Sequence, residues 1–439
     1  MRVHYHTFGC KANQYDTERM RQELEARGTQ TVEGSDEADL VVVNTCTVTN
    51  QADAQARRFV RRLHRERPDA RIVVAGCSAA LRADEYAKMP GVVGVVGGHD
   101  PVQVAQAAQP RSLVQLELRR DLDRLDTEPI GGSLLREREG ATRGWLKVQD
   151  GCDRKCAFCA TRLARGASRS RSVDEVVAEA ALLAQRHPEL VITGVHVGHY
   201  GLDLPEATTL GALVETLLAR VPAVRLRLGS IEATEIDDHL LELLAGSDGR
   251  LAPHLHMPLQ SGADAVLRRM RRWHTREMYR RRALEIAERL PVLGLGADII
   301  TGFPGETDAD HAETAELVEE LPYTYLHVFP FSPRDDTVAA ELQREMPVPQ
   351  RIAADRARHL RDLAQSKGQA YLARRVGDSA AVALEGRRSD GLRLGLTEDY
   401  LRLAVRVTGA GEDVGAVSHL VSGKIIADGS EPVIEVALD

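Results

Sequence analysis

Short apolar runs alternate with amphipathic stretches over the first hundred residues. Four of the runs are rich in β-branched side chains and predict strands, at residues 3–8, 40–45, 72–76 and 92–96. Helical patterns lie between them, at residues 13–27, 50–66 and 81–89. Nearly continuous apolar strands with intervening helices are typical of a parallel sheet that is covered on both faces. We therefore expect an open α/β domain of the Rossmann or flavodoxin-like kind over residues 1–108.

A second alternation of strands and helices follows a polar, patternless linker at residues 109–141. Six strands are predicted over residues 142–372, at residues 145–149, 190–195, 224–229, 254–259, 293–300 and 323–329. Ser172 and Glu175 form an S-x-x-E capping box ahead of an apolar run, which predicts the start of a helix. This pattern suits a closed or partial (β/α)6 barrel, whose chemistry lies at the C-terminal ends of the strands.

The pattern changes to short alternating strands over residues 373–439. The strands are predicted at residues 380–384, 392–396, 400–407, 416–421, 424–427 and 433–438. Glycine, aspartate and serine separate them, so we expect a small all-β barrel or sandwich that serves as a binding module. This tail is not basic, because it has eight Lys and Arg against eleven Asp and Glu.

Composition narrows the class of protein. The chain has 439 residues, enough for two or three domains, and its 43% hydrophobic and 28% charged residues are ordinary for a globular protein. No run of about 18 apolar residues is present, so no membrane span is expected. The N-terminal "MRVHYHTFGC" lacks the pattern of a secretory signal. We expect a cytoplasmic protein, in which clustered thiols bind metal or do chemistry more often than they form lasting disulfides.

Basic residues are gathered into three runs although the net charge is −8. Residues 57–67 have six arginines against Glu66, and residues 268–282 have eight against Glu277. Residues 143–171 have eight Lys and Arg against two aspartates. A single run of this kind is usually a solvated helix face, but three runs favour a partner that bears phosphates.

Half of the six cysteines lie within eight residues, in "GCDRKCAFC". Cys152, Cys156 and Cys159 give the spacing C-x3-C-x2-C, directly after the first strand of the barrel. Zinc needs four ligands, and a redox pair would leave Cys152 unexplained, so both alternatives fit poorly. Three thiolates on one loop can bind three irons of a [4Fe–4S] cluster and leave the fourth iron open.

The other cysteines each follow a predicted strand of the first domain. Cys10, Cys46 and Cys77 come after residues 3–8, 40–45 and 72–76. One such residue is usually a small buried hydrophobe. Three of them at the C-terminal ends of parallel strands should converge at the crevice where open α/β sheets bind ligands, which suggests a second iron–sulfur cluster.

These motifs resemble those of known families. "GCDRKCAFC", with Phe158 beside the last cysteine, resembles the radical-SAM superfamily loop, whose open iron chelates S-adenosylmethionine (SAM) and whose electron cleaves it to a 5′-deoxyadenosyl radical. Over nearly the whole chain, "TFGCKANQYDTE", "NTCTVTNQAD", "VVAGCSA", "HMPLQSGADAVLRRMRR" and "TGFPGET" are similar to motifs of the methylthiotransferases. "LRLGSIEA" departs from the family at Gly229 and Ala233.

The resemblance implies a fold, cofactors and partners. It implies a radical-SAM partial barrel, a C-terminal TRAM domain, two [4Fe–4S] clusters and SAM as cofactor. Cys152, Cys156 and Cys159 would hold the catalytic cluster, and Cys10, Cys46 and Cys77 the auxiliary one. "GCKANQYDTE" and "NTCTVT" are most similar to the branch that methylthiolates C2 of N6-threonylcarbamoyladenosine at position 37 of tRNA. The partners would be the tRNA anticodon loop, SAM, and an electron donor such as flavodoxin or ferredoxin.

Six further residues are candidate SAM-side residues. Thr193, Gly194 and Glu232 follow the second and third strands, where turn and cap roles are the alternative. The resemblance implies that Gly302, Gly305 and Glu306 shape the SAM side of the barrel. The histidine pairs at 4 and 6, 196 and 199, and 254 and 256 are interpreted as hydrogen-bonded or solvent-facing, not as zinc ligands.

Two other functions stay open at this point. The acidic tail would suit a methylthiotransferase that modifies an aspartate of a ribosomal protein. An iron–sulfur sensor that binds RNA without catalysis would need the clusters but no SAM pocket.

Overall fold

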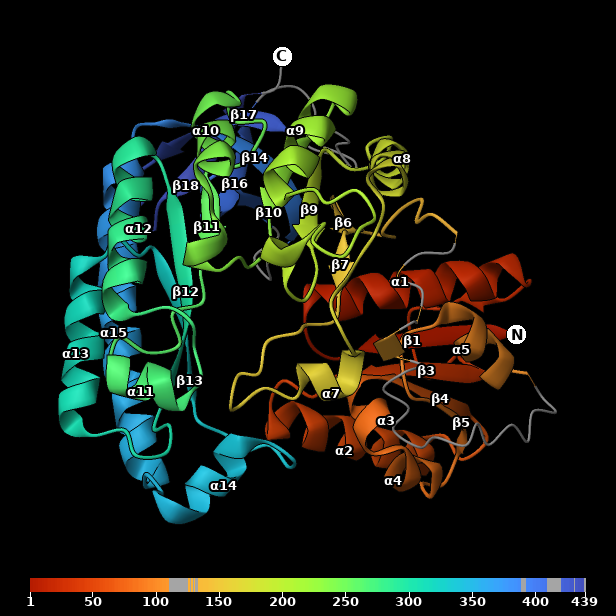
Figure 1. Ribbon diagram of the computed structural model, residues 1–439. Helices are drawn as coiled ribbons and strands as arrows, with labels where there is room; N and C mark the ends of the chain where they lie inside the picture. Colours follow the sequence, from red (N-terminus) through yellow and green to blue (C-terminus); the bar gives the residue numbers. More distant parts are fainter. Residues whose placement is uncertain are drawn as a thin grey trace.

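The computed structural model describes residues 1–109, 125–126, 128, 130, 133–387, 392–408, 420–429 and 431–437. Most of the predicted linker therefore lies outside the described residues, as does most of the strand predicted at residues 416–421. Three units follow one another along the chain (Figure 1). No helix among the described residues has the length and apolar character needed to cross a membrane.

The N-terminal unit is a five-stranded parallel sheet in the order β2-β1-β3-β4-β5. Its strands are β1 (Arg2–Thr7), β2 (Gln30–Thr31), β3 (Leu40–Thr45), β4 (Arg71–Gly76) and β5 (Val92–Val96). The helices are α1 (Lys11–Ala26), α2 (Asn50–Glu66), α3 (Cys77–Leu81), α4 (Ala83–Ala87) and α5 (Pro101–Ala107). The four predicted strands are confirmed, and the two-residue edge strand β2 is an addition.

Helices cover both faces of this sheet because successive side chains of each strand point to opposite sides. Val3, Val42 and Val73 pack with Met20 and Leu24 of α1. Other side chains of the same strands pack on the opposite face, against Val60 and Leu63 of α2. Figure 1 accordingly shows α1 and α2 on opposite sides of the sheet.

The central unit is a partial barrel of six parallel strands. They are β6 (Arg143–Lys147), β9 (Glu189–Thr193), β10 (Arg225–Leu228), β11 (His254–His256), β12 (Gly294–Thr301) and β13 (Tyr325–Pro330). β10-β9-β6 and β11-β12-β13 form two sheets, which single bridges such as Ser230–His256 join into one curved wall. Within the described residues no ladder joins β6 to β13, so the barrel is open there.

Helices surround this wall. They are α7 (Thr161–Arg165), α8 (Val173–Leu183), α9 (Leu210–Arg220), α10 (Asp238–Gly246), α11 (Asp264–Arg269), α12 (Arg276–Arg289), α13 (Asp308–Glu320), α14 (Val338–Glu345) and α15 (Gln350–Arg375). Single turns of 3-10 helix lie at Val197–His199 and Ala233–Glu235, and the short strands β7 (Gln149–Asp150) and β8 (Arg169–Ser170) form a ribbon. The predicted capping box is confirmed, because the Ser172 hydroxyl accepts a hydrogen bond from the Glu175 backbone N–H.

The C-terminal unit is a closed five-stranded barrel in the order β14-β15-β16-β18-β17. Its strands are β14 (Ser379–Arg387), β15 (Arg393–Leu396), β16 (Arg402–Thr408), β17 (Val421–Ile426) and β18 (Val433–Ala437). The C-terminal unit packs against the N-terminal ends of the strands of the central barrel. There the Arg227 guanidinium donates hydrogen bonds to the carbonyls of Thr397 and Glu398. The opposite, C-terminal ends of the strands are left for the functional site.

Candidate functional site

Cys10, Cys46 and Cys77, called the first cysteine set below, lie at one edge of the N-terminal sheet. Cys10 is the N-cap of α1, Cys46 follows β3, and Cys77 begins α3 directly after β4. The strand order reverses between β1 and β3, and open α/β sheets bind ligands at this switch point. The convergence predicted from the sequence therefore follows from the topology.

Gly9 allows Cys10 and Cys46 to approach each other. Its φ is +101°, and a Cβ at this position would lie 2.5 Å from the Cys46 sulfur, so no larger residue fits without displacing that thiol. Asn13 holds the same two loops together, because its side-chain amide donates to the carbonyls of Phe8 (2.8 Å) and Thr45 (2.9 Å).

Burial dominates the chemistry of the first cysteine set. Burial raises the pKa of Cys77 to about 12 and also raises the pKa of Cys46, so both are neutral thiols in the free protein at pH 7. The Cys77 sulfur lies 3.6 Å from Nε2 of His99 and 3.8 Å from Oδ1 of Asn13. Cys10 is exposed, so the set opens outward on that side.

Cys152, Cys156 and Cys159, the second cysteine set, lie on the loop that follows β6 and β7. Gly151 starts this loop with φ +71°, and a Cβ there would lie 1.7 Å from the Ala167 carbonyl oxygen. The backbone N–H of Ala157 donates to the Met270 carbonyl (2.9 Å). The ring of Phe158 packs edge-on against the ring of Phe303, with 6.5 Å between the ring centroids. The loop is therefore fixed against the C-terminal ends of the barrel strands.

Charged side chains surround the second cysteine set. Arg272 donates to the Cys156 sulfur (3.6 Å) and forms a buried ion pair with Glu232. Nδ1 of His196 lies 3.7 Å from the Cys152 sulfur, while its Nε2 contacts Glu235 at 2.8 Å. Burial raises the pKa of Cys152 to about 12 and raises that of Cys156, which the nearby Arg272 partly opposes.

Residues next to both cysteine sets line one small cavity. Thr47, next to Cys46, and Ala160, next to Cys159, both line this cavity of about 70 Å³. Arg334 lines it as well, and its guanidinium interacts electrostatically with both Cys46 and Cys159. Residues about a hundred positions apart in the chain thus meet at one place.

A buried charge cluster joins the N-terminal unit to the barrel beneath these thiols. Arg165 pairs with Asp150 and Asp16, each at 2.9 Å, and Lys147 pairs with the same two aspartates at 2.6 Å. Arg165 also donates to Oδ1 of Asn13 and interacts with Cys77 and Cys10. Sequence analysis missed Asn13, Asp16, Arg165 and Arg334, because nothing in their local pattern marks them as buried.

The six candidate SAM-side residues fall into two groups. Thr193 ends β9 and Gly194 follows it beside Gln149, and Glu232 contacts the second cysteine set through Arg272. Glu306 instead accepts hydrogen bonds from the Gly302 backbone N–H and from Arg356, both at 2.6 Å, while a Cβ on Gly305 would meet Met346. The second group builds the turn that carries Phe303, which in turn supports Phe158 of the cysteine loop.

Two histidine groups have the spacing of metal ligands. His196, His199 and Glu235 form one group, and His256, Asp298 and His327 form the other. In both, at least one ring nitrogen of each histidine has a protein hydrogen-bond partner, as when His256 and His327 share the Oδ1 of Asp298 at 3.1 and 3.2 Å. This agrees with the interpretation of His196, His199 and His256 as hydrogen-bonded side chains.

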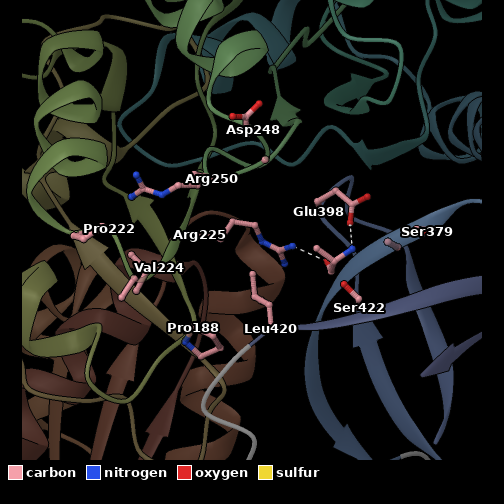
Figure 2. Close-up of a pocket in the computed structure, with 14 residues that line it drawn as sticks. Pro188, Pro222, Val224, Arg225, Asp248, Arg250, Ser379, Glu398, Leu420 and Ser422 are labelled. Carbon is pink, nitrogen blue, oxygen red and sulfur yellow. Dashed lines mark hydrogen bonds between the residues drawn. The ribbon is translucent and has the colours of Figure 1, made fainter. Parts of the chain in front are cut away.

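Another cleft lies at the N-terminal ends of the barrel strands, opposite the end where barrel chemistry takes place. It has a volume of about 560 Å³ and is lined by Pro188, Arg225 and Ser379 among others (Figure 2). Arg225 there donates to the Ala381 carbonyl, at the N-terminal ends of the strands, where side chains serve stability. We therefore assign this cleft to the junction of two units.

The structure corrects the interpretation of two arginine-rich runs. In residues 268–282, five of the eight arginines form ion pairs within the protein: Arg269, Arg272, Arg276, Arg280 and Arg282. In residues 143–171, six of the eight basic residues do so: Arg143, Lys147, Arg154, Arg162, Arg165 and Arg171. The pairs of the 268–282 run all lie within the barrel, whereas Arg143, Lys147 and Arg165 of the other run pair with other units. Both runs therefore have fewer free charges than their sequences suggest.

The donor set fits iron–sulfur clusters. All six cysteines are free thiols, gathered as two sets of three. A neutral thiol must release its proton in order to bind a metal, and the bound thiolate is negatively charged. Arg165, Arg272 and Arg334 lie where they would balance this negative charge. No fourth protein thiol is present for either set, because the chain has six cysteines in all.

Comparisons with known proteins give consistent results. Residues 2–98 match the family described as "Uncharacterized protein family UPF0004", and residues 146–318 match the radical SAM superfamily. The chain is 34% identical to the threonylcarbamoyladenosine tRNA methylthiotransferase MtaB of Bacillus subtilis, over 97% of this chain and 94% of the relative. It is 36% identical to MtaB of Rickettsia prowazekii, over 86% of each chain.

Two further similarities matter below. The chain is 35% identical to a tRNA-2-methylthio-N(6)-dimethylallyladenosine synthase of Sorangium cellulosum, over 87% of this chain and 81% of the relative. Among solved structures, it resembles the radical S-adenosylmethionine methyltransferase TsrM of Kitasatospora setae, with a TM-score of 0.57 and 16% identity over 82% of this chain and 84% of that one. This last likeness concerns the fold alone.

Proposed function

The chain belongs to the radical-SAM methylthiotransferase family, and we propose that it converts N6-threonylcarbamoyladenosine at position 37 of tRNA to its 2-methylthio derivative. The observation that carries the reaction type is that two separate sets of three thiols lie near the same buried Arg334 and near one cavity, which Thr47 and Ala160 beside them line. The base is supported by relatives of 34 and 36% identity whose names specify threonylcarbamoyladenosine. We take residues 1–108, 142–372 and 373–439 as the three domains, with a linker at 109–141 between the first two.

We propose that each cysteine set holds one [4Fe–4S] cluster. An iron–sulfur cluster and SAM supply one-electron chemistry that can activate an aromatic C–H bond, which acid–base groups cannot do. The second set is the one next to the candidate SAM contacts Thr193, Gly194 and Glu232. Cys46 of the first set lies near the same Arg334 as Cys159 of the second, so a methylthio group could be delivered to the same base.

The protein's own residues have positioning roles in this scheme. Arg272 joins Glu232 to Cys156 and so holds the candidate SAM side against the cysteine loop. Asn13 and Arg165 tie the first set to the barrel, which fixes the separation of the two sets. Arg334 places a buried positive charge between them. A target adenine would have to leave the stacked anticodon loop to enter this site.

The experiment is a comparison of four substrates with reconstituted enzyme, SAM and a reducing system such as flavodoxin. They are tRNA with threonylcarbamoyladenosine, tRNA with unmodified adenosine, tRNA with dimethylallyladenosine, and the ribosomal protein whose aspartate is the alternative target. We expect a mass gain of one methylthio group only on the first nucleoside. A gain on dimethylallyladenosine alone, or on the peptide alone, would contradict the proposed base.

The same reaction separates catalysis from a sensor role. An enzyme produces 5′-deoxyadenosine from SAM, whereas an RNA-binding iron–sulfur sensor does not. We place the reaction in the cytoplasm, because six free thiols suit a reducing compartment and its tRNA is the proposed substrate. Absence of 5′-deoxyadenosine from fully reduced, iron-loaded protein would favour the sensor.

A further inference from the structure

One arginine-rich run differs from the other two in how its charges are used. Arg57 of α2 pairs with Asp53 and Glu85, and Arg67, which caps the C-terminus of α2, donates to the carbonyls of Ser35 and Ala38. For Arg58, Arg61 and Arg65 no ion pair or hydrogen bond is seen in the part of the chain that the structure describes, and all three side chains are exposed. Arg62 is 3.9 Å from Glu66 and 58% exposed. One side of α2 therefore presents uncompensated positive charge.

These arginines surround an aromatic hollow. His6 and Phe8 of the chain around β1 and Phe59 of α2 line a groove of about 630 Å³, together with Gln55 and the arginines at 58, 61, 62 and 65. The rings of His6 and Phe59 stack at 3.9 Å with an angle of 13°, and Phe8 lies edge-on to both. We call this the aromatic–arginine groove.

The groove combines the two features that bind single-stranded nucleic acid. Aromatic rings stack with bases, and arginines bind phosphates on either side of a stacked base. Burial, His4 and Arg62 lower the pKa of His6 to about 4, so its ring is neutral at pH 7. His6 therefore contributes a flat ring to the floor, and the positive charge comes from the rim.

The groove also lies next to the functional site. Phe8 precedes Cys10 by two residues, a separation of at most about 7 Å along the chain. Gly9 between them contacts Cys46. A nucleotide held in the groove would thus be a short distance from the first cysteine set.

We propose that the aromatic–arginine groove binds an unpaired nucleotide of the tRNA anticodon stem-loop, with its base against the aromatic floor and its flanking phosphates at the arginine rim. This inference rests on the proposed function, because it supplies the docking of the same substrate. It assigns the role to α2 and β1, where the sequence pattern had distributed it over three runs.

The charge test replaces Arg58, Arg61 and Arg65 together by Gln. A matched control replaces Arg281, Arg289 and Arg374, three exposed arginines of the barrel helices with no ion pair among the described residues, so the charge change is the same. Binding to a threonylcarbamoyladenosine stem-loop is measured by fluorescence anisotropy at several salt concentrations. We expect at least tenfold weaker binding in roughly 0.1 M salt. The salt slope, which is the slope of the logarithm of the binding constant against the logarithm of the salt concentration, should be smaller by about 2, since each single-strand phosphate contact contributes about 0.7 to it.

The stacking test replaces Phe59 by Leu, which keeps an apolar side chain but removes the ring. We expect binding about five- to tenfold weaker with an unchanged salt slope, because a stacked base is lost and no phosphate contact is. Iron content, and formation of 5′-deoxyadenosine from SAM without tRNA, should equal those of the wild type in every variant, which shows that the fold is intact.

The outcomes separate this inference from the proposed function. If the wild type methylthiolates tRNA and the α2 triple variant binds the stem-loop like its control, the groove is overturned and the function stands. If the wild type binds the stem-loop but never modifies it, the proposed reaction fails, and the groove is still decided by the two variants. If the wild type does not bind the stem-loop, the groove is overturned.

Discussion

Replacing Arg165 by Met should strongly destabilise the junction between the N-terminal unit and the barrel. Arg165 is buried and contacts both Asp150 and Asp16 at 2.9 Å. Without it, Lys147 alone faces two buried carboxylates, so one negative charge is left without a partner. Removal of one partner from a buried ion pair costs about 3–5 kcal/mol, and we expect this range for the free energy of unfolding at pH 7.

The choice of pH follows from the aspartates. Burial alone would raise the pKa of Asp150, but Arg165 and Lys147 outweigh it and lower the pKa well below its usual value. A lowered carboxyl pKa stabilises the folded state above the unfolded pKa of about 3.9, and this contribution disappears as the pH falls through the folded pKa. The comparison at pH 7 therefore measures the full effect.

Trp145 reports on this junction directly. The protein has two tryptophans, and the indole N–H of Trp145 on β6 donates to the side chain of Gln14 on α1 at 3.1 Å. In a Trp273→Phe background, urea unfolding followed by fluorescence thus measures the separation of α1 from the barrel. Iron-free protein is used, so that metal binding does not contribute to the transition.

Two companion variants make the reasoning refutable. Arg165→Lys keeps the charge but cannot pair with both aspartates as the guanidinium does. We expect the free energy of unfolding to fall by a smaller amount, about 1–3 kcal/mol. Asp150→Asn combined with Arg165→Met restores neutrality, so it should be at least about 1.5 kcal/mol more stable than the sum of the single changes. A loss below about 1 kcal/mol in Arg165→Met, or strict additivity in the pair, would refute the account.

Three further predictions concern the metal, the glycine beside it and pH. Changing all of the first cysteine set, or all of the second, to Ala should lower the iron content from about eight to about four, and only the second change should abolish 5′-deoxyadenosine formation; a wild-type value of about four would exclude two clusters. Gly9→Ala should lose the iron of the first set because its Cβ meets Cys46, whereas Gly28→Ala, with φ +84° and open space around it, should keep its iron. Equal iron in both glycine variants would contradict the packing argument. Burial lowers the pKa of His274 to about 4, so the unfolded chain gains a proton first as the pH falls below about 6.5. The wild type should therefore lose about 1–2 kcal/mol more stability than His274→Gln between pH 7 and 5, and parallel curves in urea titrations would disprove this.

The sequence pattern predicted the strands and helices well where apolar residues were periodic. The strands at 40–45 and 92–96 and the helix at 50–66 have the predicted bounds. The edge strand β2 was missed, because two residues are too short to show alternation. The convergence of Cys10, Cys46 and Cys77 was predictable, since parallel strands end at one edge.

The arginines show where local pattern fails. Arg58 and Arg272 both lie in runs of positive charge, yet Arg58 is exposed on α2 and Arg272 is buried between Glu232 and Cys156. Which arginine is free depends on whether a carboxylate from another element reaches it, and that carboxylate is 40 residues away in the chain for Arg272. Sequence spacing does not contain this information.

By itself, the sequence determined the order of units, the two cysteine sets and the resemblance to a family, because these depend on periodicity and on spacing within short segments. The tertiary structure alone decided that residues next to the two sets line one cavity, that Asn13, Arg165 and Arg334 lie close to the thiols, and that α2 keeps the free positive charge. These features arise when elements distant in sequence pack together. A buried ion pair or an aromatic groove forms only where such packing excludes water and brings partners within about 3–4 Å.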